Sequence, residues 1–364
     1  MVTEQRLPAE QRYAEELTAL ADRDRATGDP IPPGWRLSAR AVRSFVLGDE
    51  DTGISRKFYG DDPLVDRAVV SLLGNQGLML VGEPGTAKSL LSELFAAAIS
   101  GDSGLVVQGT AGTTEDHIRY SWNYALLLAE GPSRRALVPS PVYRGMEHGR
   151  VVRFEEITRC APEIQDTLVS ILSEKQLMVP ELGEEARLPA RPGFTVIATA
   201  NLRDRGVNEM SAALKRRFAF ETVRPIADRE FEVDLVQRAL AAELGDVAEM
   251  VDTPKPVIDL LVTVFQELRT GRTIAGTPIS RPQTVMSTAE AVNVAHAAAL
   301  EARYLGDGVV HAGRLAGQLA GVALKDAQDD AATLRSYLDT VVRERARTDA
   351  TWRAFLEGAA GLWQ

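Results

Sequence analysis

Cysteine is almost absent from this sequence. Cys160 is the only cysteine among 364 residues, so the chain can form no internal disulfide and no cysteine-rich zinc site. This cysteine content is typical of a reducing compartment, and we expect a cytoplasmic protein. The sequence also lacks the run of about 18 apolar residues that a membrane-spanning helix needs. Residues 1–10 alternate charged and polar side chains without the apolar core of a signal peptide, so we expect no membrane insertion.

Histidine and net positive charge are scarce as well. The four histidines show no pair at metal-ligand spacing on a common helix face: His117, His148, His296 and His311. The formal net charge is −10. Because non-specific affinity for nucleic acid comes mainly from clustered cations, this charge argues against a nucleic-acid partner.

The composition and the patterns along the chain indicate two folded domains with an N-terminal addition. With 45% hydrophobic and 25% charged residues, the chain resembles an ordinary globular protein. Residues 1–48 predict a helical appendage, with helices over Ala9–Arg25 and Ser38–Val46. Residues 49–226 alternate apolar strands with helices, which is typical of an α/β domain with a parallel sheet. Residues 227–364 show helical periodicity only.

The predicted strands of the α/β domain are short apolar runs: Leu78–Val81, Leu105–Gln108, Val151–Phe154, Phe194–Ala200 and Phe218–Val223. Helices are predicted over Ser89–Ile99 and Pro162–Lys175 in the same domain. In the helical domain they are predicted over Asp228–Leu244, Lys255–Thr270, Gln283–Tyr304 and Ala312–Arg345.

A glycine-rich loop directly follows the first predicted strand and directly precedes a helix: Gly82-Glu83-Pro84-Gly85-Thr86-Ala87-Lys88-Ser89. Such a loop points backbone N–H groups at phosphate oxygens, and the helix N-terminus adds a favourable dipole. Lys88 is expected to reach the β- and γ-phosphates, and the Ser89 hydroxyl to bind Mg²⁺. Ala87 stands where a second glycine is usual and must accept that backbone conformation. A tight turn without a ligand is the alternative, which the flanking strand and helix disfavour.

Two carboxylates, Glu155 and Glu156, end the third predicted strand. In a parallel sheet the carboxyl ends of the strands face the ligand. We assign Glu155 to the hydrated Mg²⁺ and Glu156 to the water that attacks the γ-phosphorus. The alternative is a solvated strand end, where glutamate is common.

Three further polar residues fit the same chemistry. Asn201 follows the most apolar strand, where its amide can position the attacking water; a turn-forming asparagine is the alternative. Arg217, with Arg216 as the second choice, precedes the fifth strand and can stabilise transition-state charge in a neighbouring subunit. Arg281 is expected in the first turn of a helix, where its charge opposes the helix dipole unless an anion is near. Surface positions are the alternative for both arginines.

In this order, these elements resemble those of the AAA+ ATPases, and the segments Pro139–Arg159 and Pro162–Leu172 are similar to the MoxR group, a clade with an insert in helix 2. The resemblance implies a three-layer α/β nucleotide domain with a five-stranded parallel sheet of order 5-1-4-3-2, and an all-helical lid. It implies a hexameric ring with ATP and Mg²⁺ at the subunit junctions. It also implies chaperone-like remodelling or maturation of a protein substrate, with a partner that carries a von Willebrand factor A domain.

The resemblance also assigns residues. Glu156 is then the catalytic carboxylate, Asn201 the first sensor, Arg217 the trans-acting finger and Arg281 the second sensor. The implied nucleotide contacts are Gly60, which falls where the family contacts adenine, and Gly82, Glu83, Pro84, Gly85, Thr86, Ala87, Lys88, Ser89 and Leu90. Ser89 and Glu155 would hold the metal.

Glu155 departs from the family pattern, because the family has an aspartate at this position. The longer side chain moves the carboxylate by about one methylene. The sequence therefore leaves three functions open: an ATP-hydrolysing remodelling factor, a nucleotide-gated scaffold with little turnover, and a DNA- or GTP-directed relative.

Two segments exceed a minimal nucleotide domain. Ile118, Tyr120, Trp122 and Tyr124 alternate with more polar residues before the turn at Gly131-Pro132-Ser133, which predicts a hairpin-like insertion. Its aromatic edge either touches a partner or substrate or packs on its own domain. The segment Gln176–Pro189 resembles a hairpin that precedes the first sensor in the same clade.

Overall fold

The computed structural model describes residues 6–183, 186–201, 207–284, 286–323 and 328–360. The chain forms two compact units, one of residues 1–83 and 87–224 and the other of residues 84–86 and 225–364. The proposed boundaries at residues 48 and 226 stay predictions.

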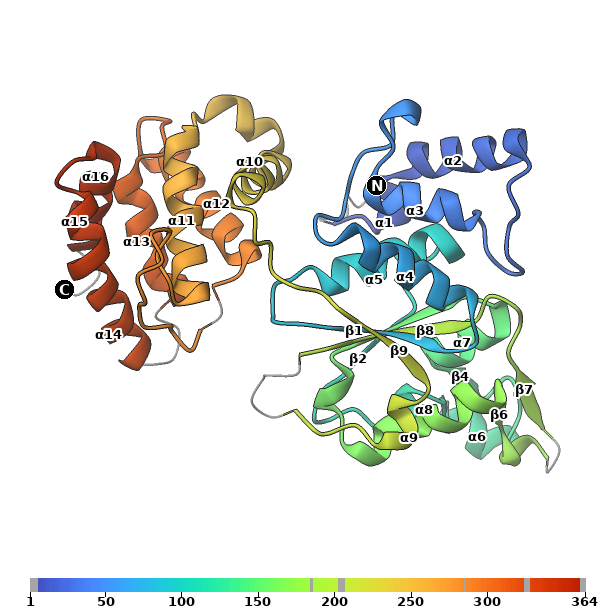
Figure 1. Ribbon diagram of the computed structural model, residues 1–364. Coiled ribbons are helices and arrows are strands. Elements are labelled where there is room, and N and C mark those ends of the chain that lie inside the picture. The colour runs from blue at the N-terminus through green and yellow to red at the C-terminus, as the bar shows by residue number, and fades with distance from the viewer. Residues whose placement is uncertain (1–5, 184–185, 202–206, 285, 324–327, 361–364) are drawn as a thin grey trace. The chain divides into compact units, whose positions relative to one another are not determined.

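A five-stranded parallel sheet forms the centre of the first unit (Figure 1). Its strands are, in spatial order, β2 (Val106–Gln108), β5 (Val151–Glu155), β8 (Thr195–Ala200), β1 (Gly77–Val81) and β9 (Phe218–Thr222). Every neighbouring pair is parallel. Numbered along the chain, the order is 2-3-4-1-5, which confirms the expected order 5-1-4-3-2 counted from the other edge. Each predicted strand is present.

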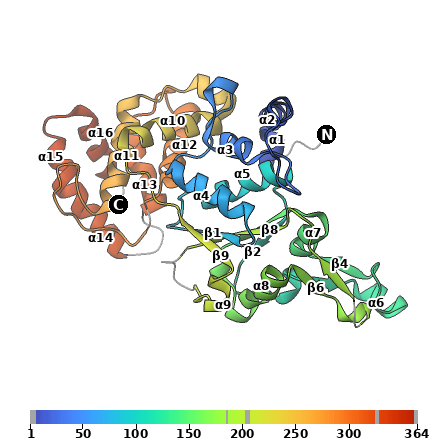
Figure 2. The same cartoon turned by 45° about the vertical axis from the view of Figure 1, so that its right-hand side comes forward.

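Both faces of the sheet are covered, which explains why its strands are apolar throughout. Leu78 and Leu80 of β1 join one buried cluster, and Met79 and Val81 join the cluster on the opposite face. The first cluster lies under α4 (Asp62–Leu73) and α5 (Lys88–Ser100); the second contains α7 (Pro141–His148) and α8 (Pro162–Glu174) (Figures 1 and 2). The short helix α9 (Ala212–Lys215) precedes β9. These are the three layers that the sequence predicts.

The N-terminal helices are α1 (Ala9–Arg12), α2 (Ala14–Thr27) and α3 (Ala39–Leu47). The single helix predicted over Ala9–Arg25 is wrong, because Tyr13 leaves helical geometry with φ −119° and separates two helices. The Tyr13 ring instead packs edge-on against Phe45, with the ring centres 5.8 Å apart. Phe45 lies in the same buried cluster as Phe95 of α5, so these helices extend the core of the first unit.

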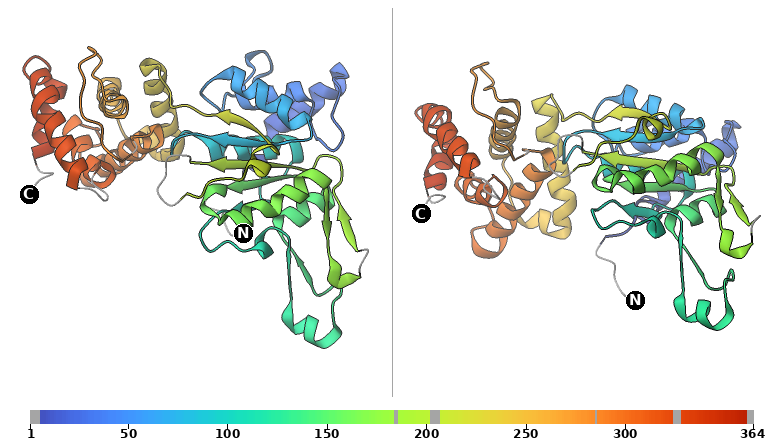
Figure 3. Two further views of the ribbon diagram at one scale, coloured as in Figure 1. Left: turned by 60° about the horizontal axis from the view of Figure 1, so that its bottom comes forward. Right: turned by 90° about the horizontal axis from the view of Figure 1, so that it is seen from below.

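Two antiparallel hairpins extend from the lower side of the sheet (Figure 3). The first pairs β3 (Tyr120–Trp122) with β4 (Leu137–Pro139) and carries α6 (Tyr124–Glu130); the second pairs β6 (Gln176–Met178) with β7 (Arg187–Pro189). Both predicted hairpins are confirmed. The aromatic residues of the first hairpin differ in exposure: Tyr120 is buried against its own unit, whereas Tyr124 is 70% exposed.

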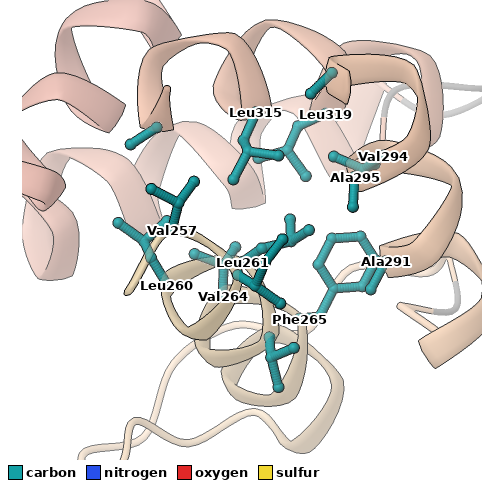
Figure 4. Close-up of a cluster of buried hydrophobic side chains, with 14 of the residues drawn as sticks. Val257, Leu260, Leu261, Val264, Phe265, Ala291, Val294, Ala295, Leu315 and Leu319 are labelled. Atoms are coloured by element: carbon teal, nitrogen blue, oxygen red, sulfur yellow. The ribbon is translucent and has the colours of Figure 1, made fainter. Parts of the chain in front are cut away.

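The second unit contains helices only in its described part. They are α10 (Arg229–Leu244), α11 (Lys255–Thr270), α12 (Thr288–Leu305), α13 (Ala312–Ala323), α14 (Gln328–Tyr337), α15 (Arg343–Arg345) and α16 (Ala350–Ala359). Their core joins Leu261 and Phe265 of α11 to Ala295 of α12 and to Leu315 and Leu319 of α13 (Figure 4). None of the helices described in the two units is both long and apolar enough to span a membrane.

The helix predicted over Gln283–Tyr304 needs correction, because it begins only at Thr288, where Ser287 and Glu290 form a capping box. The segment predicted over Ala312–Arg345 is helical in α13 and again through α14, the π-helical turn Leu338–Val342 and α15. Residues 324–327 lie outside the described part, so the continuity of this helix stays a prediction. The last helix, α16, lies beyond the predicted helix ranges, within the C-terminal region that is expected to be helical; Asp349 caps its first N–H groups.

Candidate nucleotide-binding site

The glycine-rich loop joins β1 to α5 as predicted. β1 ends at Val81 and α5 begins at Lys88. Gly85 has φ 73°, and Ala87 has φ 65° at the N-cap of α5. Ala87 therefore accepts the left-handed conformation that its position requires, at a cost of about 1–2 kcal/mol. The first turn of α5 carries no acidic side chain, so the positive end of its dipole is not neutralised there.

Lys88 is held inside this loop. Its side-chain ammonium donates hydrogen bonds to the carbonyl oxygens of Gly82, at 3.1 Å, and of Glu83, at 2.7 Å. The residue is only 7% exposed. A buried ammonium that is bound by backbone carbonyls lies where a phosphate of a ligand can replace them as its partner.

Glu155 accepts hydrogen bonds from four side chains. Its Oε2 accepts from the Ser89 hydroxyl at 2.7 Å and from the Thr199 hydroxyl at 2.8 Å. Its Oε1 accepts from the Ser92 hydroxyl at 2.7 Å and from the Arg153 guanidinium at 2.9 Å. The two residues that the sequence assigns to a metal, Ser89 and Glu155, are therefore in direct contact.

This surrounding keeps Glu155 ionised. Burial raises the pKa of the carboxyl, but the hydrogen bonds from Ser92, Ser89 and Thr199 and the charge of Arg153 more than offset it. The resulting pKa lies below the ordinary value for glutamate. An ionised carboxylate beside a hydroxyl is the oxygen-ligand chemistry that Mg²⁺ prefers, so the residues present fit this metal.

Glu156 has a special backbone conformation at the end of β5. Its φ is 54° and its ψ is 45°, in the left-handed region. Its backbone N–H donates to the Thr199 hydroxyl at 2.9 Å, and its carboxylate forms an ion pair with Arg159. A Cβ on Gly109 would lie 2.4 Å from the Glu156 carbonyl oxygen, so glycine is required there to let the two backbones approach.

Asn201 follows β8 at the same edge of the sheet. β8 lies between β5 and β1, and Ala200 pairs with Val81, the last residue before the loop. The topology thus brings Asn201 between the carboxylates and the phosphate loop. Asn201 is 8% exposed, and among the described residues, which exclude 202–206, its Oδ1 has no hydrogen-bond partner. A buried acceptor of this kind is expected to accept a hydrogen bond from a water or a ligand.

Arg217 lies at the opposite edge of the sheet. Gly77, the first residue of β1, pairs with Phe218 and donates its N–H to the Arg217 carbonyl. The Arg217 guanidinium donates to the Ser173 hydroxyl of α8. β1 has five residues, so one strand length of about 16 Å separates this edge from the loop. The structure therefore does not bring Arg217 to the loop of its own chain. Arg216 is exposed at the same edge.

Arg281 and Gly60 lie outside regular elements. The prediction that Arg281 sits in the first turn of a helix is wrong, because α12 begins at Thr288. Arg281 is exposed, and its aliphatic carbons lie against Gly271. Gly60 occupies the bend just before α4. The roles of both residues stay predictions.

Sequence reasoning missed three residues of this site, namely Thr199, Ser92 and Arg153. Arg153 and Thr199 are polar residues at inner positions of the apolar strands β5 and β8. A polar side chain in such a buried strand needs a buried hydrogen-bond partner, so the polar residues within these apolar runs could have indicated a site. Ser92 carried no such signal, because serine is common on helices.

Comparisons with known proteins agree with this geometry. The family profile described as AAA domain (dynein-related subfamily) matches residues 77–218, and the profile described as YehL-like AAA+ ATPase C-terminal domain matches residues 230–361. The uncharacterized protein YehL of Escherichia coli (strain K12) is 51% identical over 354 residues, covering 97% of this chain and 96% of that protein.

Two more distant proteins are also similar. The uncharacterized protein SH1500 of Staphylococcus haemolyticus is 27% identical over 219 residues, which cover 60% of this chain and 78% of that protein. The crystal structure of NtrX from Brucella abortus aligns with a TM-score of 0.49 and 14% identity, covering 82% of this chain and 62% of that chain. The two profiles and the YehL relative show the family: the chain belongs to the AAA+ ATPase family, and its C-terminal domain is of the YehL-like type.

Proposed function

We propose that this protein binds and hydrolyses ATP, and that it remodels or matures a protein substrate as a MoxR-type chaperone. The observation that carries the proposal is the 2.7 Å hydrogen bond between Ser89 and Glu155, which joins the phosphate loop to the acidic end of β5. A loop for phosphates and a carboxylate for their metal are needed together only where a nucleotide triphosphate is bound with a cation.

The chain's own residues would share the work of binding. The loop N–H groups and Lys88 would hold the phosphates, and Ser89 and Glu155 would hold Mg²⁺. Bound Mg²⁺ supplies positive charge that offsets the charge developing on the transferred phosphoryl group. Gly60 would lie near the base, as the family resemblance implies.

Hydrolysis would depend on polar groups at the same edge. Glu156 would accept a proton from the attacking water, since it follows Glu155 directly and is one-third exposed. Asn201 would orient that water with its unpartnered Oδ1. For Arg281 we keep the role of second sensor that the family resemblance implies.

Arg217 supports a site shared between two copies of the chain. It lies one strand length from the loop, too far for an arginine side chain to reach a nucleotide bound there. If Arg217 stabilises the γ-phosphate, it must do so in a neighbouring subunit. A heterologous contact of this kind forms a ring when its rotation closes, and the family resemblance implies a ring of six subunits. By the same resemblance we propose a partner with a von Willebrand factor A domain and a location in the cytoplasm.

One observation favours a second candidate, a nucleotide-gated scaffold with little turnover. Arg153 already neutralises the charge of Glu155 at 2.9 Å, and a neutralised carboxylate attracts a cation less strongly. In this case ATP would assemble the ring without rapid hydrolysis.

Phosphate release from Mg²⁺-ATP, measured against protein concentration, separates the two candidates. The wild type is compared with Glu156→Gln and with the control Glu163→Gln, a change at an exposed position of α8. We expect the rate per subunit to rise with concentration in the wild type and the control and to vanish in Glu156→Gln. Binding of a fluorescent ATP analogue should persist in all three. Binding without phosphate release in any of them would instead support the scaffold.

A further inference from the structure

Thr199 occupies the centre of the candidate site, although no comparison assigns it a role. It lies on β8, the strand between those that carry the carboxylates and the loop, and it is only 1% exposed. Its neighbours on the strand, Ala198 and Ala200, are apolar and equally buried. A buried hydroxyl is costly unless it is hydrogen-bonded, so its partners indicate what it does.

Both partners of this hydroxyl belong to the acidic end of β5. It accepts a hydrogen bond from the backbone N–H of Glu156 at 2.9 Å. It donates a hydrogen bond to Oε2 of Glu155 at 2.8 Å. One hydroxyl therefore connects the backbone of the candidate base to the side chain of the candidate metal ligand.

The first of these hydrogen bonds supports an unfavourable backbone. Glu156 has φ 54°, and the left-handed region is unfavourable for a residue with a Cβ. The hydrogen bond from the Glu156 N–H to the Thr199 hydroxyl offsets part of this cost, because without it that N–H would lack a partner on β8. The left-handed turn redirects the chain at this residue, and therefore sets the direction in which the Glu156 side chain leaves β5.

The second hydrogen bond orients Glu155 toward the loop. Oε1 of Glu155 is occupied by Ser92 and by the charged Arg153. Oε2 is shared by two neutral hydroxyls, those of Ser89 and Thr199. Thr199 thus holds the oxygen that contacts the metal-binding serine of the loop.

We propose that Thr199 is a positioning residue for hydrolysis, which fixes Glu155 and Glu156 relative to each other and to Ser89. This inference rests on the proposed function. It requires that loss of the Thr199 hydroxyl leaves metal-free nucleotide binding intact and impairs the steps that need both carboxylates in place.

The chain offers a matched control on the same strand. Thr195 precedes Thr199 by four residues and therefore points to the same face of β8. It is 5% exposed, and its hydroxyl has no hydrogen-bond partner in the part of the chain that the structure describes. Thr195→Val and Thr199→Val make the same change in the same strand, but only the second removes hydrogen bonds. Thr199→Ser keeps the hydroxyl and serves as the rescue.

Two readouts test the proposal. For Mg²⁺-ATP hydrolysis by Thr199→Val we expect kcat to fall about tenfold to a hundredfold and KM to rise by a smaller factor, because the groups are misplaced and not lost. Thr195→Val and Thr199→Ser should stay near the wild type. For binding of a fluorescent ATP analogue, affinity in EDTA should be unchanged in Thr199→Val, whereas the gain in affinity on adding Mg²⁺ should be smaller than in Thr195→Val.

The outcomes distinguish a failure of the proposed hydrolysis from a failure of the proposed role of Thr199. If the wild type binds ATP but releases no phosphate, the proposed hydrolysis fails, and the Mg²⁺-dependent binding still tests Thr199. If the wild type is active and Thr199→Val matches Thr195→Val in both readouts, the inference about Thr199 is overturned. Thermal denaturation checks folding; should Thr199→Val not fold, Thr199→Ala against Thr195→Ala makes the same comparison.

Discussion

Replacing Arg153 by methionine should destabilise the first unit, by an amount that grows with pH. The Arg153 and Glu155 side chains are 12% and 5% exposed and lie 2.9 Å apart. Removal of one partner of a buried pair costs about 3–5 kcal/mol, because the other charge stays buried without its counter-ion. Methionine retains an unbranched apolar side chain, so most of the packing is kept. Three hydroxyls still donate to Glu155, so we expect the lower end of this range, about 3 kcal/mol.

The dependence on pH follows from the pKa of Glu155. In the wild type this pKa lies below the ordinary value, so the ionised carboxylate stabilises the fold above the ordinary pKa, and this contribution is lost as pH falls through the lowered value. Without Arg153 one of the causes that lower this pKa is lost, so the pKa of Glu155 is higher than in the wild type and the ionised carboxylate stabilises the fold less. The difference in unfolding free energy between the two proteins should therefore increase as pH rises from below the lowered pKa of the wild type to neutral pH.

Urea unfolding in EDTA, at pH 5 and at pH 7.5, measures this difference. Arg150→Met is the control, because Arg150 belongs to a more exposed ion pair with Asp102 just before β5. We expect at most about 1 kcal/mol for the control at both pH values. An Arg153→Met protein no less stable than Arg150→Met, or a difference that shrinks as pH rises, would refute the reasoning.

Three further changes test other parts of the structure. Phe265→Ala removes a fully buried ring from the core of the second unit and should cost about 3–5 kcal/mol in calorimetry; a loss under about 1 kcal/mol would contradict the described packing. Ala87→Gly relieves the strain of the left-handed alanine but gives the unfolded chain more conformational freedom, so the free energy of unfolding measured in urea should change by less than about 0.5 kcal/mol. A larger loss of stability would show that the Cβ stabilises the loop. Lys88→Met should weaken binding of a fluorescent ATP analogue at least about tenfold, and unchanged affinity would remove Lys88 from the site.

The sheet could be predicted from the sequence because its strands are buried on both faces. Continuous apolar runs such as that of Leu78–Val81, each followed by a helical pattern, leave few alternatives to a parallel sheet. The strand order came from a family resemblance, since periodicity does not specify which strands are neighbours. The phosphate loop was also predictable, because its residues are consecutive in the chain.

Residues that act through distant partners were harder to predict. Thr199 and Ser92 meet Glu155 only when β8, α5 and β5 are assembled, and nothing in the local sequence names their partner. The start of α12 is a different case. The capping box of Ser287 and Glu290 is readable in the sequence, but Ser280 and Pro282 are also residues that begin helices, and they favoured an earlier start.

The place of Arg217 follows from chain direction alone. A residue just before a strand of a parallel sheet lies at the edge opposite to the loops that follow the strands. The structure adds that this arginine is tethered to Ser173 of α8. This position leads directly to the central claim, that ATP is hydrolysed at a site shared between two copies of the chain.

Mixing two inactive variants tests that claim most directly. Glu156→Gln keeps the arginine but lacks the base, and Arg217→Ala keeps the base but lacks the arginine. We predict that neither releases phosphate from Mg²⁺-ATP alone and that the mixture does, because some junctions then combine an intact base with an intact arginine. Arg216→Ala, at the neighbouring exposed position, should stay active by itself. A mixture as inactive as its components, prepared under conditions in which the wild type hydrolyses ATP, would contradict the shared site.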